Sequence, residues 1–133
     1  MNRLTLAIAV IITIGSPAYA TDQLDCLTRI IYAESQGAHL EAVAINAKAT
    51  INRAEGGNFC QLIKTGSVHA SKTVPADVQP YFKAVADAAL KTKRDISHGA
   101  NAWNTGTKPR QPGHIKRIAG GQVFYAMAEP MGK

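Results

Sequence analysis

The residues Asp25-Cys26-Leu27-Thr28-Arg29-Ile30-Ile31-Tyr32-Ala33-Glu34-Ser35-Gln36-Gly37 form the most informative stretch of this 133-residue chain. Within it, Leu27, Ile30 and Ile31 have the three-and-four spacing that places side chains on one face of a helix. We therefore predict a helix from Asp25 to Ser35.

Glu34 lies on the same apolar face, seven residues after Leu27. A carboxylate there is costly unless it is paired, hydrogen-bonded or protonated. In a partly apolar cleft, loss of solvation favours the neutral form of a carboxyl group, which then serves as a proton donor. The alternative is a Glu34 that rotates into solvent or pairs with Arg29 or Arg53.

In the rest of the chain, the spacing of apolar and turn-forming residues predicts helices first and short strands later. The expected elements are a helix from Leu40 to Ala54, a short turn or helix from Phe59 to Lys64, a loop over 66–76, a helix from Asp77 to Lys93, a loop or a few short strands over 96–114, and a strand at 123–125. This order is typical of an α+β domain that is rich in helix and ends in a short β element.

The first 20 residues have the three parts of a cleavable export signal. Arg3 gives the positive start, 4–14 form an apolar run, and Ala18-Tyr19-Ala20 fits the small-x-small cleavage rule. The run is shorter than the roughly 20 apolar residues that span a bilayer, and an uncleaved anchor is the alternative. We predict one exported domain, residues 21–133, that works in the periplasm or outside the cell without stable membrane insertion.

Charge and cysteine content support that placement. Without Arg3, 14 basic and 9 acidic residues give the exported domain a net charge of +5, which suits an anionic partner such as a cell wall or a lipid surface. No dense Lys/Arg run indicates nucleic acid, and we expect a monomer. Cys26 and Cys60 predict a disulfide in an exported domain, against two buried free thiols or a nucleophilic cysteine.

The first helix also resembles a known family. Residues 25–37, together with Glu41 and Ile51-Asn52-Arg53, are similar to the opening motif of the SleB-type cell wall hydrolases, and 99–104 and 120–125 resemble the family's later segments. The resemblance implies a lysozyme-like domain that cleaves the glycan strands of peptidoglycan as a lytic transglycosylase, with Glu34 as the catalytic acid. It implies no cofactor and no metal.

Four further residues are expected to bind substrate. They are Trp103, Asn104, Tyr32 and Glu41. Trp103 either stacks on a sugar ring or packs into the core and thereby holds its loop against it. Core packing is the alternative for Tyr32, and a first-turn acid that complements the helix dipole is the alternative for Glu41.

The chain departs from the family pattern at three places, namely Ala42-Val43, the loop around His69, and Gln122 in place of a histidine. These departures bear on the substrate subsites rather than on the fold. Two rival functions remain at this point. One is a zinc amidase, although the histidines His39, His69, His98 and His114 form no H-x-x-x-H pair. The other is a wall-binding module without activity, which the charge and Trp103 would serve equally well.

Overall fold

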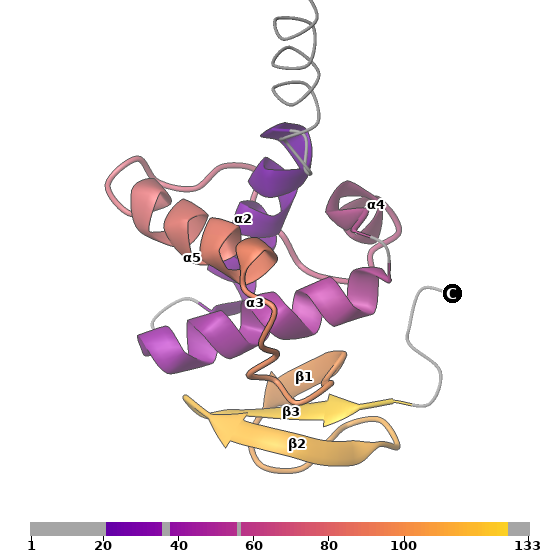
Figure 1. The fold of residues 1–133 in the computed structure, drawn as a ribbon. Helices are drawn as coiled ribbons and strands as arrows, with labels where there is room; N and C mark the ends of the chain where they lie inside the picture. Colours follow the sequence, from indigo (N-terminus) through magenta and orange to yellow (C-terminus); the bar gives the residue numbers. More distant parts are fainter. Residues whose placement is uncertain (1–20, 36–37, 56, 128–133) are drawn as a thin grey trace, which may run out of the picture.

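The computed structural model describes residues 21–35, 38–55 and 57–127, so the predicted export signal lies outside the described residues. The elements in chain order are α2 (Thr21–Ser35), α3 (Leu40–Ala54), α4 (Phe59–Lys64), α5 (Gln79–Lys91), β1 (Ala102–Thr105), β2 (His114–Ala119) and β3 (Gln122–Ala126). Figure 1 shows α3 between two layers, with the other helices on one side and the sheet on the other. The predicted α+β class is confirmed.

The helical layer is built on the apolar face that the sequence predicted. Leu27, Ile30 and Ile31 are completely buried, and they pack with Val43 of α3 and Phe59 of α4. Burying a side chain of this size contributes about 1.5–3 kcal/mol. These contacts fix α2 against three other helices, and they place its last turn at the border with the sheet.

The helix boundaries agree with the predictions to within a few residues. The range of α3 is as predicted, and the segment from Phe59 to Lys64 is a helix, with the Asn58 side chain accepting a hydrogen bond from the Gln61 backbone N–H. The predicted start of α2 at Asp25 is wrong, because the helix already includes Thr21. The predicted bounds of α5 were two residues too wide at each end, since Thr92 is already extended.

The sheet is antiparallel with strand order β1-β3-β2. Gly120 and Gly121 join β2 to β3 with φ of +56° and +76°, the left-handed conformation that a two-residue hairpin turn needs. The sequence did not predict β2. Its Ile115 and Ile118 are 50% and 53% exposed, and a register shift between Ile115 and Arg117 interrupts the alternation by which a half-buried strand is recognised.

A second core joins the sheet to α3. Ile45 and Ala49 of α3 pack on Phe124 of β3, and all three are completely buried. Trp103 of β1 packs against this cluster and also against the helical cluster. The aromatic ring of Trp103 therefore lies where the helical core and the core under the sheet meet.

Polar contacts fasten the segment between α5 and β1 to the end of α3. The Asn52 side-chain amide donates to Asp95 Oδ2 at 3.0 Å and to the Ala100 carbonyl at 2.8 Å. Burial alone would raise the pKa of Asp95, but hydrogen bonds from Ser97, Asn52 and Gly99 outweigh it and hold the pKa below its usual value. Asp95 thus stabilises the fold in its charged form.

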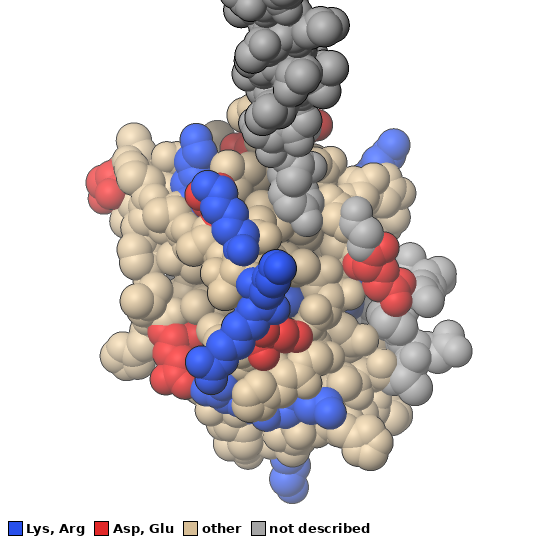
Figure 2. Space-filling model, in the orientation of Figure 1, with Lys and Arg blue, Asp and Glu red and all other residues tan. Residues whose placement is uncertain are grey.

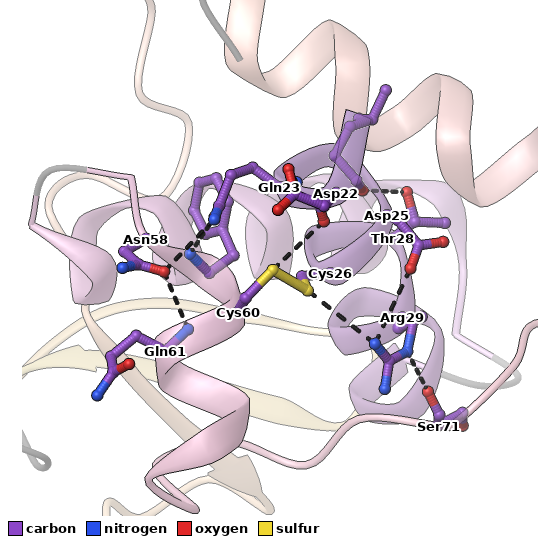
Figure 3. Close-up of a disulfide and its surroundings, with 12 residues drawn as sticks. Asp22, Gln23, Asp25, Cys26, Thr28, Arg29, Asn58, Cys60, Gln61 and Ser71 are labelled. Atoms are coloured by element: carbon purple, nitrogen blue, oxygen red, sulfur yellow. Dashed lines mark hydrogen bonds and ion pairs between the residues drawn. A yellow bond between two sulfur atoms is a disulfide. The ribbon is translucent and has the colours of Figure 1, made fainter. Parts of the chain in front are cut away.

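The Cys26–Cys60 disulfide is present, with a Cα–Cα distance of 5.2 Å, and it ties α4 to α2 (Figure 3). One helical turn further along α2, Arg29 Nε donates to the Ser71 carbonyl at 2.7 Å. The segment from α4 to Ser71 is therefore attached to α2 at both ends. In the described part of the chain, no helix has the length and apolar character needed to cross a membrane.

Candidate functional site

Glu34 lies in the last turn of α2, where two surface hollows meet. Its side chain is 15% exposed. Each hollow has a volume of about 290 Å³, and Glu34 lines both of them. Four other residues also line both hollows, namely His69, Trp103, Asn104 and Arg110. The two hollows therefore form one cleft, and the Glu34 carboxylate lies at its centre.

Both carboxylate oxygens of Glu34 have a partner. Trp103 Nε1 donates a hydrogen bond to Oε2 at 2.6 Å, and His69 Nδ1 lies 3.1 Å from Oε1. The backbone carbonyl of Glu34 accepts a hydrogen bond from Gln122 Nε2 at 2.9 Å. These contacts come from three different parts of the chain, and they fix the position of the carboxyl group and of the helix end that carries it.

Arg53, from the last turn of α3, lies behind Trp103. Its guanidinium is 5.5 Å from the centre of the indole ring, and it donates to Ser67 Oγ and to the Asn101 carbonyl, both at 2.9 Å. Burial lowers the pKa of Arg53, while Tyr125 and Glu34 partly oppose this effect. The guanidinium thus stabilises the indole ring through a cation–π contact and places positive charge near Glu34.

The loop that carries His69 is held from both sides. Ser67 is bonded to Arg53, and Ser71 is bonded to Arg29 of α2. The His69 side chain itself is 91% exposed. The loop backbone is therefore fixed, whereas the imidazole ring has little packing besides its contact with Glu34.

Asn104 organises the part of the cleft that follows β1. Its side-chain amide donates to the carbonyls of Thr105 and Lys108, and its Oδ1 accepts a hydrogen bond from the Arg110 backbone N–H, each at 2.9 Å. These three bonds fold the chain after β1 back on itself. As a result, Arg110 lies at the cleft, which His69 also lines.

The structure brings two of the four predicted substrate-binding residues, Trp103 and Asn104, into the cleft. It does not place Tyr32 or Glu41 there. The Tyr32 ring packs edge-on against Phe82, with 5.2 Å between ring centres, because a residue two positions before Glu34 faces another side of the helix. Glu41 instead accepts a hydrogen bond from Arg117 Nη2 at 2.6 Å on the surface.

Neither arginine that was considered as a partner of Glu34 forms an ion pair with it. Arg29 is bonded to Ser71, and Arg53 is bonded to Ser67 and Asn101. A site role for His69, Gln122 or Arg110 was not predictable from the sequence, because no local pattern connects them to Glu34. The only sequence signal for His69 and Gln122 was that both stand at departures from the family pattern.

Among the described residues, no three His, Cys, Asp or Glu side chains are close enough together to hold a metal ion. Comparison of the whole chain with protein-family models, with curated proteins and with solved structures gives no match. The likeness to the SleB-type hydrolases, including the lysozyme-like architecture, therefore rests on the quoted sequence motifs alone.

Proposed function

We propose that this protein is a peptidoglycan-degrading enzyme that cleaves the glycan strand as a lytic transglycosylase, with Glu34 as its catalytic acid. One observation carries the proposal. Among the described residues, Glu34 has the only carboxyl group that lines the cleft; its side chain is 15% exposed and lies where the two hollows meet, as a proton donor between two sugar-binding positions would. The motif around Glu34 supports the same reaction.

The hydrogen bonds indicate which oxygen would carry the proton in the acid form that the mechanism requires. The indole N–H of Trp103 can only donate, so it is best accepted by the carbonyl-type oxygen of a protonated carboxyl group, and it contacts Oε2. The acidic proton of Glu34 then belongs on Oε1. This oxygen faces His69 Nδ1 and the cleft.

The reaction proceeds in two proton transfers through the same oxygen. Glu34 Oε1 first gives its proton to the glycosidic oxygen that follows N-acetylmuramic acid, and the bond from that oxygen to the sugar's C1 breaks. The Oε1 carboxylate then accepts the proton of that sugar's own C6 hydroxyl, whose oxygen bonds to C1. The product is a 1,6-anhydro sugar, and Glu34 regains its proton. A second catalytic carboxylate is not needed, unlike in ordinary glycosidases.

His69 is placed to make way for the substrate. Its ring contacts the reactive oxygen of Glu34 and is 91% exposed. Rotation of the ring away from Oε1 therefore gives up little packing. The sugar oxygen then takes the place of the imidazole nitrogen.

The cellular location is part of the proposal. Peptidoglycan lies outside the cytoplasmic membrane, and the predicted export signal would deliver the chain there. The Cys26–Cys60 disulfide is of the kind that persists in oxidising compartments. The net charge of +5 in residues 21–133 suits an anionic wall.

The test is clearing of purified peptidoglycan by the wild-type protein and by Glu34→Gln, which keeps the shape of the side chain and removes the acid. We expect the rate of clearing to fall by about 10²–10⁴-fold. Asp87→Asn is the matched control, because it neutralises a carboxylate that pairs with Lys91 on the surface of α5. Equal clearing by Glu34→Gln and the wild type would overturn the proposal.

Mass spectrometry of the released fragments identifies the bond that is cut. Lytic transglycosylation predicts 1,6-anhydro ends. Reducing ends would instead show hydrolysis of the same bond, and free stem peptides would show an amidase. Loss of clearing with a chelator, together with free peptides, would replace the proposal with the zinc amidase.

A further inference from the structure

Arg110 is the exposed cation of the cleft, and it lines both hollows beside Glu34. Within the described part of the chain, its guanidinium forms no hydrogen bond and no ion pair with the protein. Its backbone, by contrast, is held in place by the Asn104 side chain. The fold therefore fixes the chain at this position and leaves five N–H donors available at the cleft.

The chain segment that carries Arg110 contains no negatively charged side chain. Residues 96–127 contain no Asp or Glu, whereas they contain Lys108, Arg110, Lys116 and Arg117. Glu41 of α3 pairs with Arg117, which leaves Lys108 and Lys116 exposed and without an ion pair among the described residues. On the face that Figure 2 shows, acidic side chains lie beside Lys and Arg side chains.

The one carboxylate at the cleft does not satisfy this guanidinium. Glu34 is already bonded to Trp103 and lies against His69, and Arg110 is not within ion-pair distance of it. A planar guanidinium matches a carboxylate with two parallel N–H···O bonds, which makes arginine selective for that group.

We infer that Arg110 is the binding site for a carboxylate on the substrate, next to the bond that is cut. This inference rests on the proposed function. The sugar backbone of a glycan strand of N-acetylated sugars is neutral, so its negative charge lies in substituents. Two sources share the chemistry, namely the lactyl carboxylate of muramic acid where the peptide has been removed, and the carboxylates of an attached stem peptide. Arg110 thereby favours peptidoglycan over neutral glycans such as chitin.

The experiment measures binding rather than cleavage. Trp103 is the only tryptophan of the chain and lies in the cleft, so its fluorescence reports ligands there. The titrations use the Glu34→Gln protein, so that no turnover disturbs them. Four soluble ligands are compared, namely a glycan fragment with stem peptides, the same fragment with its carboxylates amidated, a peptide-free fragment with free lactyl groups, and a chitin oligosaccharide.

Adding Arg110→Gln is expected to weaken binding of a carboxylate-bearing fragment about tenfold, and to leave the amidated fragment and the chitin oligosaccharide unchanged. Lys108→Gln is the matched control, because it removes a charge from the same loop outside both hollows. Its affinities should stay within about twofold, as expected for an exposed charge. Thermal melting of each variant checks the fold.

The pattern across ligands decides the result. A loss confined to the fragment with stem peptides assigns the peptide carboxylates, and a loss confined to the peptide-free fragment assigns the lactyl group. An equal loss for carboxylated and amidated fragments, or no loss at all, would refute a carboxylate site at Arg110. Because binding does not depend on the acid, a protein that binds in this pattern but never clears peptidoglycan would contradict the proposed function alone.

Discussion

Removal of the Cys26–Cys60 disulfide tests how much of the stability of the fold comes from linking α2 to α4. The bond closes a loop of 34 residues. In the chain-entropy model, closing a loop of that length lowers the entropy of the unfolded chain by about 12.6 cal/mol/K, which is about 3.8 kcal/mol at 25 °C. The double variant Cys26→Ala/Cys60→Ala should lose this amount, since alanine keeps the site apolar.

This free energy translates into a large shift of the melting temperature. Residues 21–133 form a domain of 113 residues. At about 2.1 cal/mol/K of unfolding entropy per residue, each kcal/mol shifts Tm by about 4 °C. We expect the double variant to melt about 15 °C below the oxidised wild type. Circular dichroism melting and urea titration measure the two quantities independently.

A reductant provides the control. Cys60 is partly exposed, so dithiothreitol should bring the wild type close to the double variant and should leave the double variant unchanged. A double variant within about 1 kcal/mol of the oxidised wild type would refute the loop-entropy argument, because that argument predicts a cost almost four times larger. A shift of the double variant by dithiothreitol would show that the reagent acts elsewhere.

Two further substitutions test the charged contacts of the fold and of the cleft. Since the pKa of Asp95 is held below its usual value, its stabilisation is complete above about pH 4 and is lost as the pH falls through the folded-state pKa. Asp95→Asn should therefore lower the free energy of unfolding, measured by urea titration, by about 2 kcal/mol at pH 7 and by much less at pH 2; an equal loss at both pH values would contradict the role of the charge. Trp103→Phe keeps an aromatic ring and removes the N–H bonded to Glu34 Oε2, so peptidoglycan clearing should fall about tenfold at a temperature where circular dichroism shows the variant to be folded. Unchanged clearing would show that this hydrogen bond does not position the acid.

The helical part of the fold was predictable because the pattern that predicts each helix lies within that helix's own residues. Spacing alone predicts that Leu27, Ile30 and Ile31 share one face of a helix, and all three are completely buried. The strand from His114 to Ala119 was not predictable in the same way. It is an edge strand with one isoleucine on either side of a bulge, both half exposed, so its sequence lacks the apolar alternation of a core strand.

The candidate site shows the same division between local and distant information. The position of Glu34 on an apolar face followed from its own helix. Its partners did not, because His69 and Trp103 are 35 and 69 residues away in the sequence, and only tertiary packing brings them to the carboxylate. The position of Arg110 depends on a further set of contacts. The hydrogen bonds of the Asn104 side chain hold the intervening loop in the conformation that places Arg110 at the cleft.

Gln122 joins the end of the helix that carries Glu34 to the sheet. The last carbonyls of a helix lack partners within the helix, and the carbonyl of Glu34 is one of these groups. Gln122 Nε2 donates to it at 2.9 Å from the first position of β3. The hairpin turn at Gly120 and Gly121 sets that position, and the end of the helix is thereby joined to the sheet. A glutamine amide provides this donor at any pH, whereas a histidine at the same place would donate or not according to its tautomer and charge. Gln122 thus supplies a hydrogen bond that positions the end of the helix at Glu34, and this hydrogen bond does not depend on the titration of a side chain.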